Sequence, residues 1–539
     1  MASPSALQQA LDEWRTQLGT EAVLTAAATE AYALNTLGMA PALSAVLCPA
    51  EEQAIPGLVA IARRHRVPLY PISTGHNWGY GNALPPDPDA VVVDLSRLDE
   101  VVSFDAELGV VTVQPGVTQA GLADYLRARD APFLVPVHGG GPRCSLLGNL
   151  LERGYGITPY TDHFGAVTAL EAVLPDGSRY RPALTELGAP RADQAHKWGL
   201  GPYLDGLFGQ GGFGIVTRAT IALAPRPERI AFFHFRIDRD DRLETAVAAV
   251  GRLARELEGT LGGINVMNGR RVLSMIEPYP TAETAPGTIL DRQLIEQRLG
   301  RYGAGAWTGV GALYGPAGVV RAAQRHVRTV LRRSGFRPGF WAKGKLALAR
   351  RGLGVLPSRW SRSSRQRLDK LAQTLQLLEG QPSTVALPLA CWRTSRPAAD
   401  ADTDPARGGC GLIWHAPLVP LSPERARAYI TLVETTCAEF GIEPLITLTT
   451  LSSRCFDSTV PLLFDPAEPG AADRARRCQE ALLTRGREQG FLPYRLDVRA
   501  MSQMVEGDLP FWNTVRRIKQ AVDPDGIMAP GRYAPRDPS

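Results

Sequence analysis

A glycine-rich loop between two short apolar runs constrains the fold of this chain more than any other feature. The loop, Ser-Thr-Gly-His-Asn-Trp-Gly-Tyr-Gly, occupies residues 73–81, and β-type runs flank it at residues 67–72 and 90–95. Glycine adopts left-handed backbone conformations without steric cost, so successive N–H groups in such a loop can point inward and bind an anion. The pattern predicts a cradle for a diphosphate group between two strands. A simple glycine-rich hairpin is the alternative, because glycine spacing alone is weakly specific.

The bulk composition is that of a globular protein with more than one domain. With 539 residues, of which 44% are hydrophobic, the chain can bury two or more sizeable cores. A net charge of +5 is too small to indicate a nucleic-acid partner. Seven scattered cysteines, without a CxxC pair or a histidine cluster at zinc spacing, argue against a disulfide framework and a metal site. The N-terminal sequence lacks a signal-peptide pattern and no apolar run is long enough to span a bilayer, so we expect a cytoplasmic enzyme.

Strands and helices alternate along the chain, which predicts an α+β fold. We expect strands at residues 42–49, 110–113, 167–174, 231–237 and 411–416, and helices at residues 50–65, 120–129, 243–257 and 423–440. Residues 385–389 look like a further strand, but Pro388 allows only an edge strand there, or none. Residues 207–220 resemble a GxGxxG fingerprint superficially. A β-like run follows them instead of a helix, which excludes a Rossmann site.

Five motifs in order resemble the vanillyl-alcohol oxidase and p-cresol methylhydroxylase flavoprotein superfamily. They are the loop at residues 73–81, Gln-Pro-Gly-Val-Thr at 114–118, the stretch from Gly148-Asn149 to Asp162-His163, Gly-Phe-Gly-Ile-Val-Thr at 212–217, and the C-terminal residues 522–533. The resemblance implies an FAD-binding domain of two α+β subdomains, residues 1–226 and 494–539, with an inserted α+β cap, residues 227–493, that binds the substrate. It also implies a set of FAD-binding residues: Ser73, Thr74, Gly75, Asn77, Gly79, Gly81, Pro115, Gly116, Gly148, Asn149, Gly154, Thr158, Gly214, Ile215, Val216 and Arg532.

Two residues match positions at which berberine-bridge-type relatives attach FAD covalently. His76 lies where those relatives bond the 8α-methyl carbon of the flavin, and Cys144, four residues before Gly148, lies where they bond its six-position carbon. Imidazole and thiolate are both competent nucleophiles, and Arg143 beside the thiol is placed to lower its pKa. The resemblance therefore implies bicovalent FAD. A hydrogen-bonded loop histidine and a small buried cysteine are the alternatives, and His415 is a third attachment candidate.

The resemblance also implies a substrate site. In the phenol-oxidising relatives a Tyr-Arg pair and a loop tyrosine hold the phenolate oxygen, and Tyr494, Arg495 and Tyr80 match them. Two hydroxyl donors and a guanidinium would lower the pKa of a bound phenol, which would then lose a benzylic hydride to flavin and form a quinone methide. Asp162 matches the active-site base, and His415 would line the pocket if His76 is the linker. Packing at the domain junction is the alternative role for Tyr494 and Arg495.

One cap strand departs from the family pattern. Relatives carry Met-His-His where this chain has Phe456-Asp457-Ser458, so the pocket wall differs. The expected function is FAD-dependent oxidation of a para-substituted phenol or related aromatic alcohol, with O2 or an electron-acceptor protein as partner and a homodimer left open. Berberine-bridge-type oxidation of a bulkier alcohol, sugar or natural product is the near alternative. The basic residues 321–370 are either a solvated cap insertion or, in a non-catalytic protein, a surface for a membrane or acidic partner.

Overall fold

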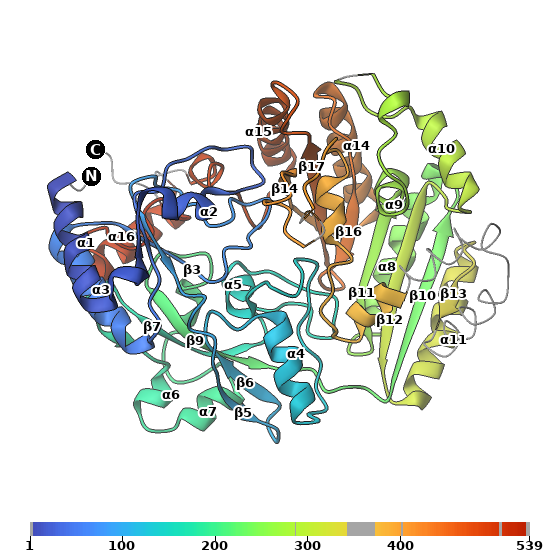
Figure 1. Cartoon of the computed structure of the whole chain (residues 1–539). Helices are drawn as coiled ribbons and strands as arrows, with labels where there is room; N and C mark the ends of the chain where they lie inside the picture. The colour runs from blue at the N-terminus through green and yellow to red at the C-terminus, as the bar shows by residue number, and fades with distance from the viewer. Residues whose placement is uncertain are drawn as a thin grey trace.

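Three sheets organise the protein (Figure 1). The computed structural model describes residues 4–285, 287–341, 372–399, 401, 403–505 and 509–534. The first sheet has the order β1-β2-β4-β3, with the strands β1 (Val23–Leu24), β2 (Val46–Leu47), β3 (Leu69–Ile72) and β4 (Val91–Asp94). The second has the order β5-β6-β9-β7-β8, with β5 (Val101–Asp105), β6 (Val110–Val113), β7 (Val167–Val173), β8 (Arg179–Tyr180) and β9 (Ile215–Ala222). Mixed helix and sheet in this arrangement confirms the expected α+β class.

Helices cover the first two sheets because each buries one apolar stripe. In α3 (Ile55–His65) the buried residues recur at helical spacing, from Ile55 through Leu58 and Val59 to Ala62. Proline in its first turn and a left-handed residue after its last turn set its ends. The neighbouring α1 (Pro4–Leu18) buries Trp14, whose indole N–H donates to the Leu58 carbonyl. The remaining helices here are α2 (Glu30–Ala33), α4 (Gln119–Ala128), α5 (Leu146–Leu151), α6 (Ala183–Glu186) and α7 (Pro190–Ala195).

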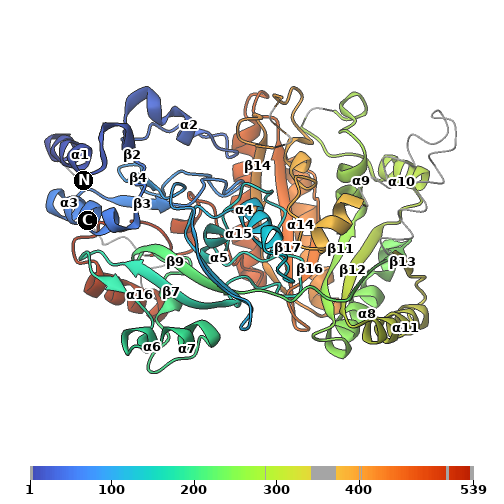
Figure 2. The same ribbon diagram turned by 60° about the horizontal axis from the view of Figure 1, so that its bottom comes forward.

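The third sheet has eight strands and forms the other half of the molecule (Figures 1 and 2). Its order is β13-β10-β12-β11-β16-β17-β14, and β15 also pairs with β17. The strands are β10 (Arg229–Ile237), β11 (Leu261–Asn268), β12 (Trp307–Gly315), β13 (Gly339–Trp341), β14 (Gly411–His415), β15 (Leu418–Pro420), β16 (Thr447–Thr450) and β17 (Cys455–Phe464). Strand β9 belongs to the second sheet and β10 to the third. The change of sheet therefore falls close to residue 227, where the proposed cap domain (residues 227–493) begins.

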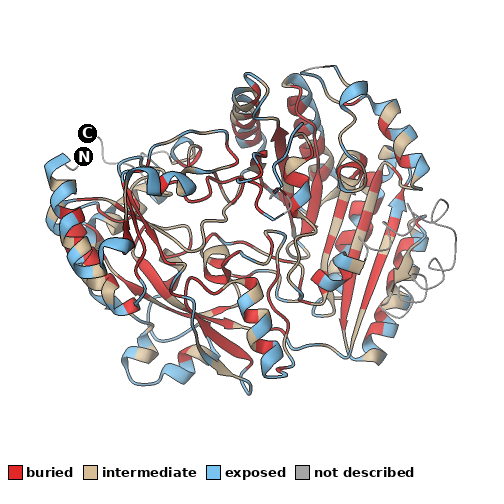
Figure 3. Cartoon of the chain, viewed as in Figure 1, coloured by how far each residue is buried: buried red, intermediate tan, exposed pale blue. Residues whose placement is uncertain are grey.

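The eight-stranded third sheet, called the cap sheet below, has two different faces. On the outer face, Phe233, Val266, Leu448 and Phe456 form one core with α8 (Leu243–Glu256), α11 (Ala317–Arg333), α14 (Pro423–Glu439) and α15 (Ala471–Gln489). Residues of the opposite parity form the inner face, which is directed toward the two smaller sheets. Tyr314 and Trp414 lie on this inner face. The Tyr314 hydroxyl donates to the Ile157 carbonyl at 3.2 Å, and the backbone N–H of Trp414 donates to the Gly79 carbonyl. Figure 3 shows the burial concentrated on the strands.

The C-terminal return completes the first sheet. After α16 (Pro510–Val522) the chain runs parallel to β3, where the Leu69 N–H donates to the Ile527 carbonyl and the Ala529 N–H to the Leu69 carbonyl, both at 2.7 Å. Lys519 on α16 donates to the carbonyls of Gly212 and Met528. The first and last parts of the chain therefore form one structural unit although the cap separates them in sequence.

The structure decides between two local alternatives at one place, and another expectation falls partly outside the described residues. Residues 385–389 form no strand: the structure has a 3-10 helix, η7 (Leu387–Cys391), with Pro388 in its first turn. Proline lacks the N–H that a sheet ladder needs but is tolerated at a helix start. Of the basic residues 321–370, the first belong to α11, whose Val320 and Val327 are buried, and residues 342–370 lie outside the described part. No helix within the described ranges is long and apolar enough to cross a membrane.

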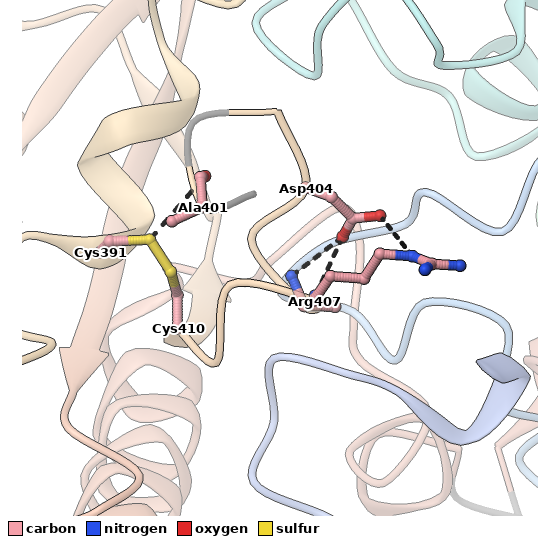
Figure 4. The surroundings of a disulfide bond; sticks show 6 residues. Cys391, Ala401, Asp404, Arg407 and Cys410 are labelled. Atoms are coloured by element: carbon pink, nitrogen blue, oxygen red, sulfur yellow. Dashed lines mark hydrogen bonds and ion pairs between the residues drawn. A yellow bond between two sulfur atoms is a disulfide. The ribbon is translucent and has the colours of Figure 1, made fainter. Parts of the chain in front are cut away.

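The cysteines form one disulfide among the described residues, which the argument against a disulfide framework did not anticipate. Cys391 and Cys410 are bonded, with their Cα atoms 4.9 Å apart (Figure 4). Cys391 ends η7 and Cys410 precedes β14, so the packing of η7 against the cap sheet brings together two residues that are 19 apart in sequence. No sequence spacing signals such a pair. The other five cysteines are free thiols.

Removing this disulfide should destabilise the cap. We expect the double variant Cys391→Ser/Cys410→Ser to unfold a few degrees below the native protein, because a cross-link over a loop of this size contributes about 3 kcal/mol through the unfolded chain. Differential scanning fluorimetry with and without dithiothreitol is the measurement, and reduction should shift only the native protein. The matched control is Cys455→Ser, which removes a half-buried free thiol. An equal shift in both proteins would contradict the prediction.

Candidate functional site

The predicted cradle loop joins two neighbouring parallel strands, β3 and β4. Gly75, Gly79 and Gly81 all have positive φ angles, of 68°, 77° and 119°, a conformation that L-residues rarely adopt. Gly79 also has no room for a Cβ atom, because the Trp414 ring of the cap occupies that space. At Gly81 a Cβ atom would lie 2.8 Å from Val498. The glycines therefore provide both the loop curvature and close contact with the cap.

The structure brings His76 and Cys144 side by side. The Nδ1 atom of His76 lies 3.2 Å from the Arg143 carbonyl, and the Cys144 thiol lies 3.8 Å from the His76 carbonyl. The thiol donates its closer hydrogen bond, at 3.0 Å, to the Gly140 carbonyl. The two nucleophiles, which are 68 residues apart, thus share one end of the cradle.

The pKa of the Cys144 thiol differs from the sequence expectation. Burial raises it to about 12, and the charges of Arg495 and Arg143 offset burial only in part. The pKa of His76 is lowered, mainly by burial and then by the charge of Arg143, so its imidazole is neutral. Arg143 therefore favours a nucleophilic state at both residues, but burial keeps Cys144 protonated near neutral pH.

Tyr80, Tyr494 and Arg495 meet where the cap joins the C-terminal return. The guanidinium of Arg495 lies 4.1 Å from the centre of the Tyr80 ring and donates to the Asn77 amide oxygen. Burial raises the pKa values of both tyrosines, and Arg495 lowers them by a smaller amount. Both phenols therefore stay protonated and can donate hydrogen bonds. Tyr80 is buried and Tyr494 and Arg495 are partly buried, so a cation and two phenol groups share a region of low exposure, which suits an oxygen that carries negative charge.

Two residues that the sequence reasoning missed hold this cluster in place. Glu152 is buried and forms ion pairs with Arg495, at 3.4 Å, and with Arg532. Gln210 donates to the Tyr494 carbonyl at 2.8 Å and to the Glu152 carbonyl at 3.3 Å. Glu152 lies two residues before the matched Gly154, so its position next to a matched motif was the available signal. Gln210 lies within the segment that looks like a GxGxxG fingerprint, which here supports the Tyr-Arg pair.

Neither the Asp162 carboxyl group nor the His415 ring forms a hydrogen bond or ion pair with the Tyr-Arg cluster among the described residues. Asp162 is exposed, and its Oδ1 atom accepts a hydrogen bond of 2.8 Å from the Gly165 N–H in a tight turn. His415 pairs in register with Val460, a residue of the outer core, so its ring is on the face covered by helices. It is 1% exposed, and neither ring nitrogen has a hydrogen-bond partner among the described residues. Among the described residues, no hydrogen bond joins the His415 ring to the cradle.

The buried His415 gives a prediction about stability at low pH. Burial lowers its pKa to about 4, whereas an unfolded histidine titrates near 6.5. Between these two pH values the unfolded chain binds more protons than the folded one. The contribution of neutral His415 to the free energy of unfolding is therefore complete above about pH 6.5. It is lost as the pH falls toward 4, by about 3 kcal/mol in all. Thermal unfolding from pH 4 to 8 should show a shallower pH slope for His415→Leu than for the native protein. The exposed control His196→Leu should keep the native slope, and equal slopes in all three would contradict the assignment.

Several buried polar atoms near the cradle have no protein partner within the described ranges. From the first two sheets these atoms are the Trp78 indole N–H, the Tyr155 and Thr158 hydroxyls and the His163 Nε2 atom. Unpartnered buried groups are costly, so such a set fits a cofactor with many acceptors and donors. The residues present therefore fit FAD: the glycine loop suits its diphosphate, and the orphaned groups offer hydrogen bonds to its polar atoms.

The remaining predicted cofactor residues surround the same region or support it. The Thr74 hydroxyl accepts from the Ser145 N–H at 3.2 Å, and a Cβ atom on Gly148 would lie 3.1 Å from the Ser73 hydroxyl. Asn149 lies 2.6 Å from His163. The others occupy turns and strand starts next to these: Pro115, Gly116 and Gly154 in loops, and Gly214, Ile215 and Val216 at the beginning of β9. Arg532 acts through its ion pair with Glu152.

Comparisons with known proteins agree with this geometry. The family model described as FAD binding domain matches residues 43–181. The chain is 33% identical to 1'-carboxy-chondrochloren decarboxylase of Chondromyces crocatus, over 98% of this chain and 97% of the relative. It is 26% identical to the flavoprotein subunit of 4-cresol dehydrogenase [hydroxylating] of Pseudomonas putida, over 92% of this chain and 88% of the relative.

Solved structures show the same fold. The p-cresol methylhydroxylase structure with bound substrate superposes with a TM-score of 0.87 at 24% identity, covering 99% of this chain and 97% of the other. The 4-ethylphenol oxidase of Gulosibacter chungangensis gives 0.88 at 23% identity, covering 99% and 98%. The chain belongs to the vanillyl-alcohol oxidase and p-cresol methylhydroxylase family of FAD-dependent oxidoreductases.

Proposed function

We propose that this enzyme oxidises the benzylic carbon of a para-substituted phenol or a related aromatic alcohol. The observation that carries the proposal is the position of Arg495. Its guanidinium contacts the Tyr80 ring, and its charge partly offsets the rise that burial causes in the pKa of Tyr494. A phenol oxygen between these groups would lose its proton more readily, because the guanidinium stabilises the phenolate and both tyrosines donate to it. The phenolate then supplies electron density to the para carbon, so a hydride can leave and a quinone methide can form.

Bound FAD supplies the two-electron acceptor for this oxidation, and O2 or an electron-acceptor protein would reoxidise it. Asp162 would act as base for the water or hydroxyl that reacts at the benzylic carbon, after its turn with Gly165 rearranges. We propose that His415 has a structural role in strand β14, because its ring is buried on the face of the sheet that the helices cover. We also propose that the enzyme forms a homodimer.

Covalent attachment of FAD through both His76 and Cys144 is also proposed. The contact of the Cys144 thiol with the His76 carbonyl supports it, since both residues would have to reach the same benzenoid ring of the flavin, one at its 8α-methyl carbon and the other at its six-position carbon. The neutral imidazole can react directly, whereas Cys144 must first lose its proton. We expect attachment at His76 to form first.

Decarboxylation is a second candidate, supported by the 33% identity to a decarboxylase over almost the whole chain. The same residues allow it when a carboxylate is bonded to the carbon next to the benzylic one. After hydride loss, the bond to the carboxylate breaks, its electron pair forms the side-chain double bond, and the phenolate is restored as CO2 leaves. The two candidates share the phenol site and differ only in the second step.

The test uses the purified holoenzyme with 4-ethylphenol, 4-hydroxybenzyl alcohol and 3-(4-hydroxyphenyl)propanoate. Bleaching of the flavin spectrum under anaerobic conditions reports the oxidation, and product analysis distinguishes the second steps. Hydroxylated or carbonyl products support phenol oxidation, and 4-vinylphenol with equimolar CO2 supports decarboxylation. Bleaching by non-phenolic alcohols or sugars, with none of the three phenols reacting, would refute both.

A further inference from the structure

Asp457 is a fully buried carboxyl group that the mechanism above does not use. It is 0% exposed, and neither carboxyl oxygen has a hydrogen-bond partner among the residues that the structure describes. A buried polar group without a partner costs about 1–3 kcal/mol. A leucine of similar size would avoid this cost, so the carboxyl group indicates a bound partner.

The register of the cap sheet places Asp457 on the inner face. Asp457 pairs with Thr449 on β16, and Thr449 pairs with Asn265 on β11, so the register places the three side chains in one row across adjacent strands. The Asn265 amide oxygen and the nearby Thr447 hydroxyl are also buried and unpartnered within the described residues. Tyr314 and Trp414, on the same face, contact the FAD-binding part. Asp457 therefore belongs to a polar wall opposite the cradle.

Strand pairing places this carboxyl group near the Tyr-Arg pair: Asp457 pairs with Leu418 on β15, and the neighbouring Pro417 forms a bridge with Pro493, which precedes Tyr494. Burial is the main cause that raises the pKa of Tyr80 and of Tyr494, and a negative charge on Asp457 raises both further. The pKa of Asp457 itself is raised well above its usual range by burial, without an offset from any described cation. Burial therefore favours the carboxylic acid form, which offers one donor and one acceptor. A general base would need the ionised form, which this environment disfavours.

We infer that Asp457 recognises a second hydroxyl group on the substrate ring, next to the phenol oxygen, so that the preferred substrates are 4-substituted catechols. A catechol hydroxyl can donate to the carbonyl oxygen of the acid and accept from its O–H, which satisfies both partners. A monophenol leaves the acid unpartnered, and a methyl ether can accept but cannot donate. This inference rests on the proposed phenol site and specifies which phenols it takes.

The experiment compares kcat/KM for 4-ethylcatechol, 4-ethylphenol and 4-ethylguaiacol in the holoenzyme and three variants. The native enzyme should prefer the catechol by about a hundredfold or more, because a site that hydrogen-bonds a hydroxyl group strongly rejects analogues without it. Asp457→Leu should lose this preference, whereas Asp457→Asn should keep it within about tenfold, because an amide also offers a donor and an acceptor. The matched control Ser458→Ala alters the neighbouring residue on the outer face and should keep the native preference.

Thermal unfolding separates recognition from a structural role. Asp457→Leu should unfold at a higher temperature than the native protein, because it removes an unpartnered buried group; a structural carboxyl would give a lower temperature. A folded, flavin-loaded Asp457→Leu enzyme with the native catechol preference would overturn the inference and leave phenol oxidation intact. If Asp457→Asn and Asp457→Leu lost the catechol preference to the same extent, the inference would also be overturned, because that result would indicate a role for the negative charge of Asp457. If the native enzyme oxidises none of the three phenols, the proposed function fails first.

Discussion

Replacing Arg495 by methionine should lower kcat/KM for 4-substituted phenols by about a thousandfold or more. The substitution removes the cation that contacts Tyr80 among the described residues, and loss of a single donor to a developing negative charge costs about a hundredfold to a thousandfold in comparable sites. Loss of the positive charge adds to this effect, because the bound phenol would then return toward its pKa in water. Stopped-flow flavin reduction with 4-ethylphenol measures the effect directly.

The Arg495 variant needs two controls, because the arginine also neutralises the buried Glu152. Arg499→Met is the matched variant: Arg499 is four residues away, pairs with Asp497 at 3.3 Å, and should remain near native activity. Arg495→Lys keeps the charge but loses the planar guanidinium, so it should recover only part of the rate. Turnover within threefold of native in a flavin-loaded Arg495→Met enzyme would remove the phenolate site from the proposal.

Covalent flavin should survive either single substitution, His76→Ala or Cys144→Ala, and be absent from the double variant. Acid precipitation followed by mass spectrometry of the denatured protein measures this without any dependence on activity. Each single variant should carry the mass of one FAD, and the double variant should release yellow FAD into the supernatant. His415→Ala is the matched control and should retain both bonds, because His415 is on the outer face of the cap sheet.

The raised pKa of Cys144 adds a pH dependence to this result. Below a pKa of about 12 the thiolate fraction rises about tenfold for each pH unit, so the His76→Ala apoprotein should incorporate FAD covalently faster at pH 9 than at pH 7. Cys144→Ala should show little dependence over this range, because the pKa of His76 lies below its usual value and the imidazole is already neutral. Covalent FAD in the double variant would instead require a different linking residue.

The ordered motifs predicted the fold well, because each glycine or strand pattern has a local physical cause. The expected strand at residues 110–113 is β6, and the expected helix at residues 120–129 is α4 with shifts of one residue. The loop glycines could be assigned because positive φ angles restrict the residue type. Pairing between distant cysteines could not be predicted, since the Cys391–Cys410 bond depends on how η7 packs against the cap sheet.

The substrate site was predictable only in part. Tyr80, Tyr494 and Arg495 carry family signatures, whereas Glu152 and Gln210 matter through contacts that exist only in the folded chain. The raised pKa of Cys144 was also hidden, because burial depends on the surrounding structure and outweighs the adjacent arginine. The departure at Asp457 was visible in the sequence, but its isolation on the inner face required strand register.

The late position of the C-terminal return has a consequence for biosynthesis. Leu69 of β3 pairs with residues 527–529, and Glu152 pairs with Arg495 and Arg532, so contacts around the cradle join the two extremes of the polypeptide. A ribosome makes the cradle loop early but releases these partners last. Vectorial folding can therefore complete the cap while the cradle still lacks its closing strand, and stable flavin loading should begin only after translation ends.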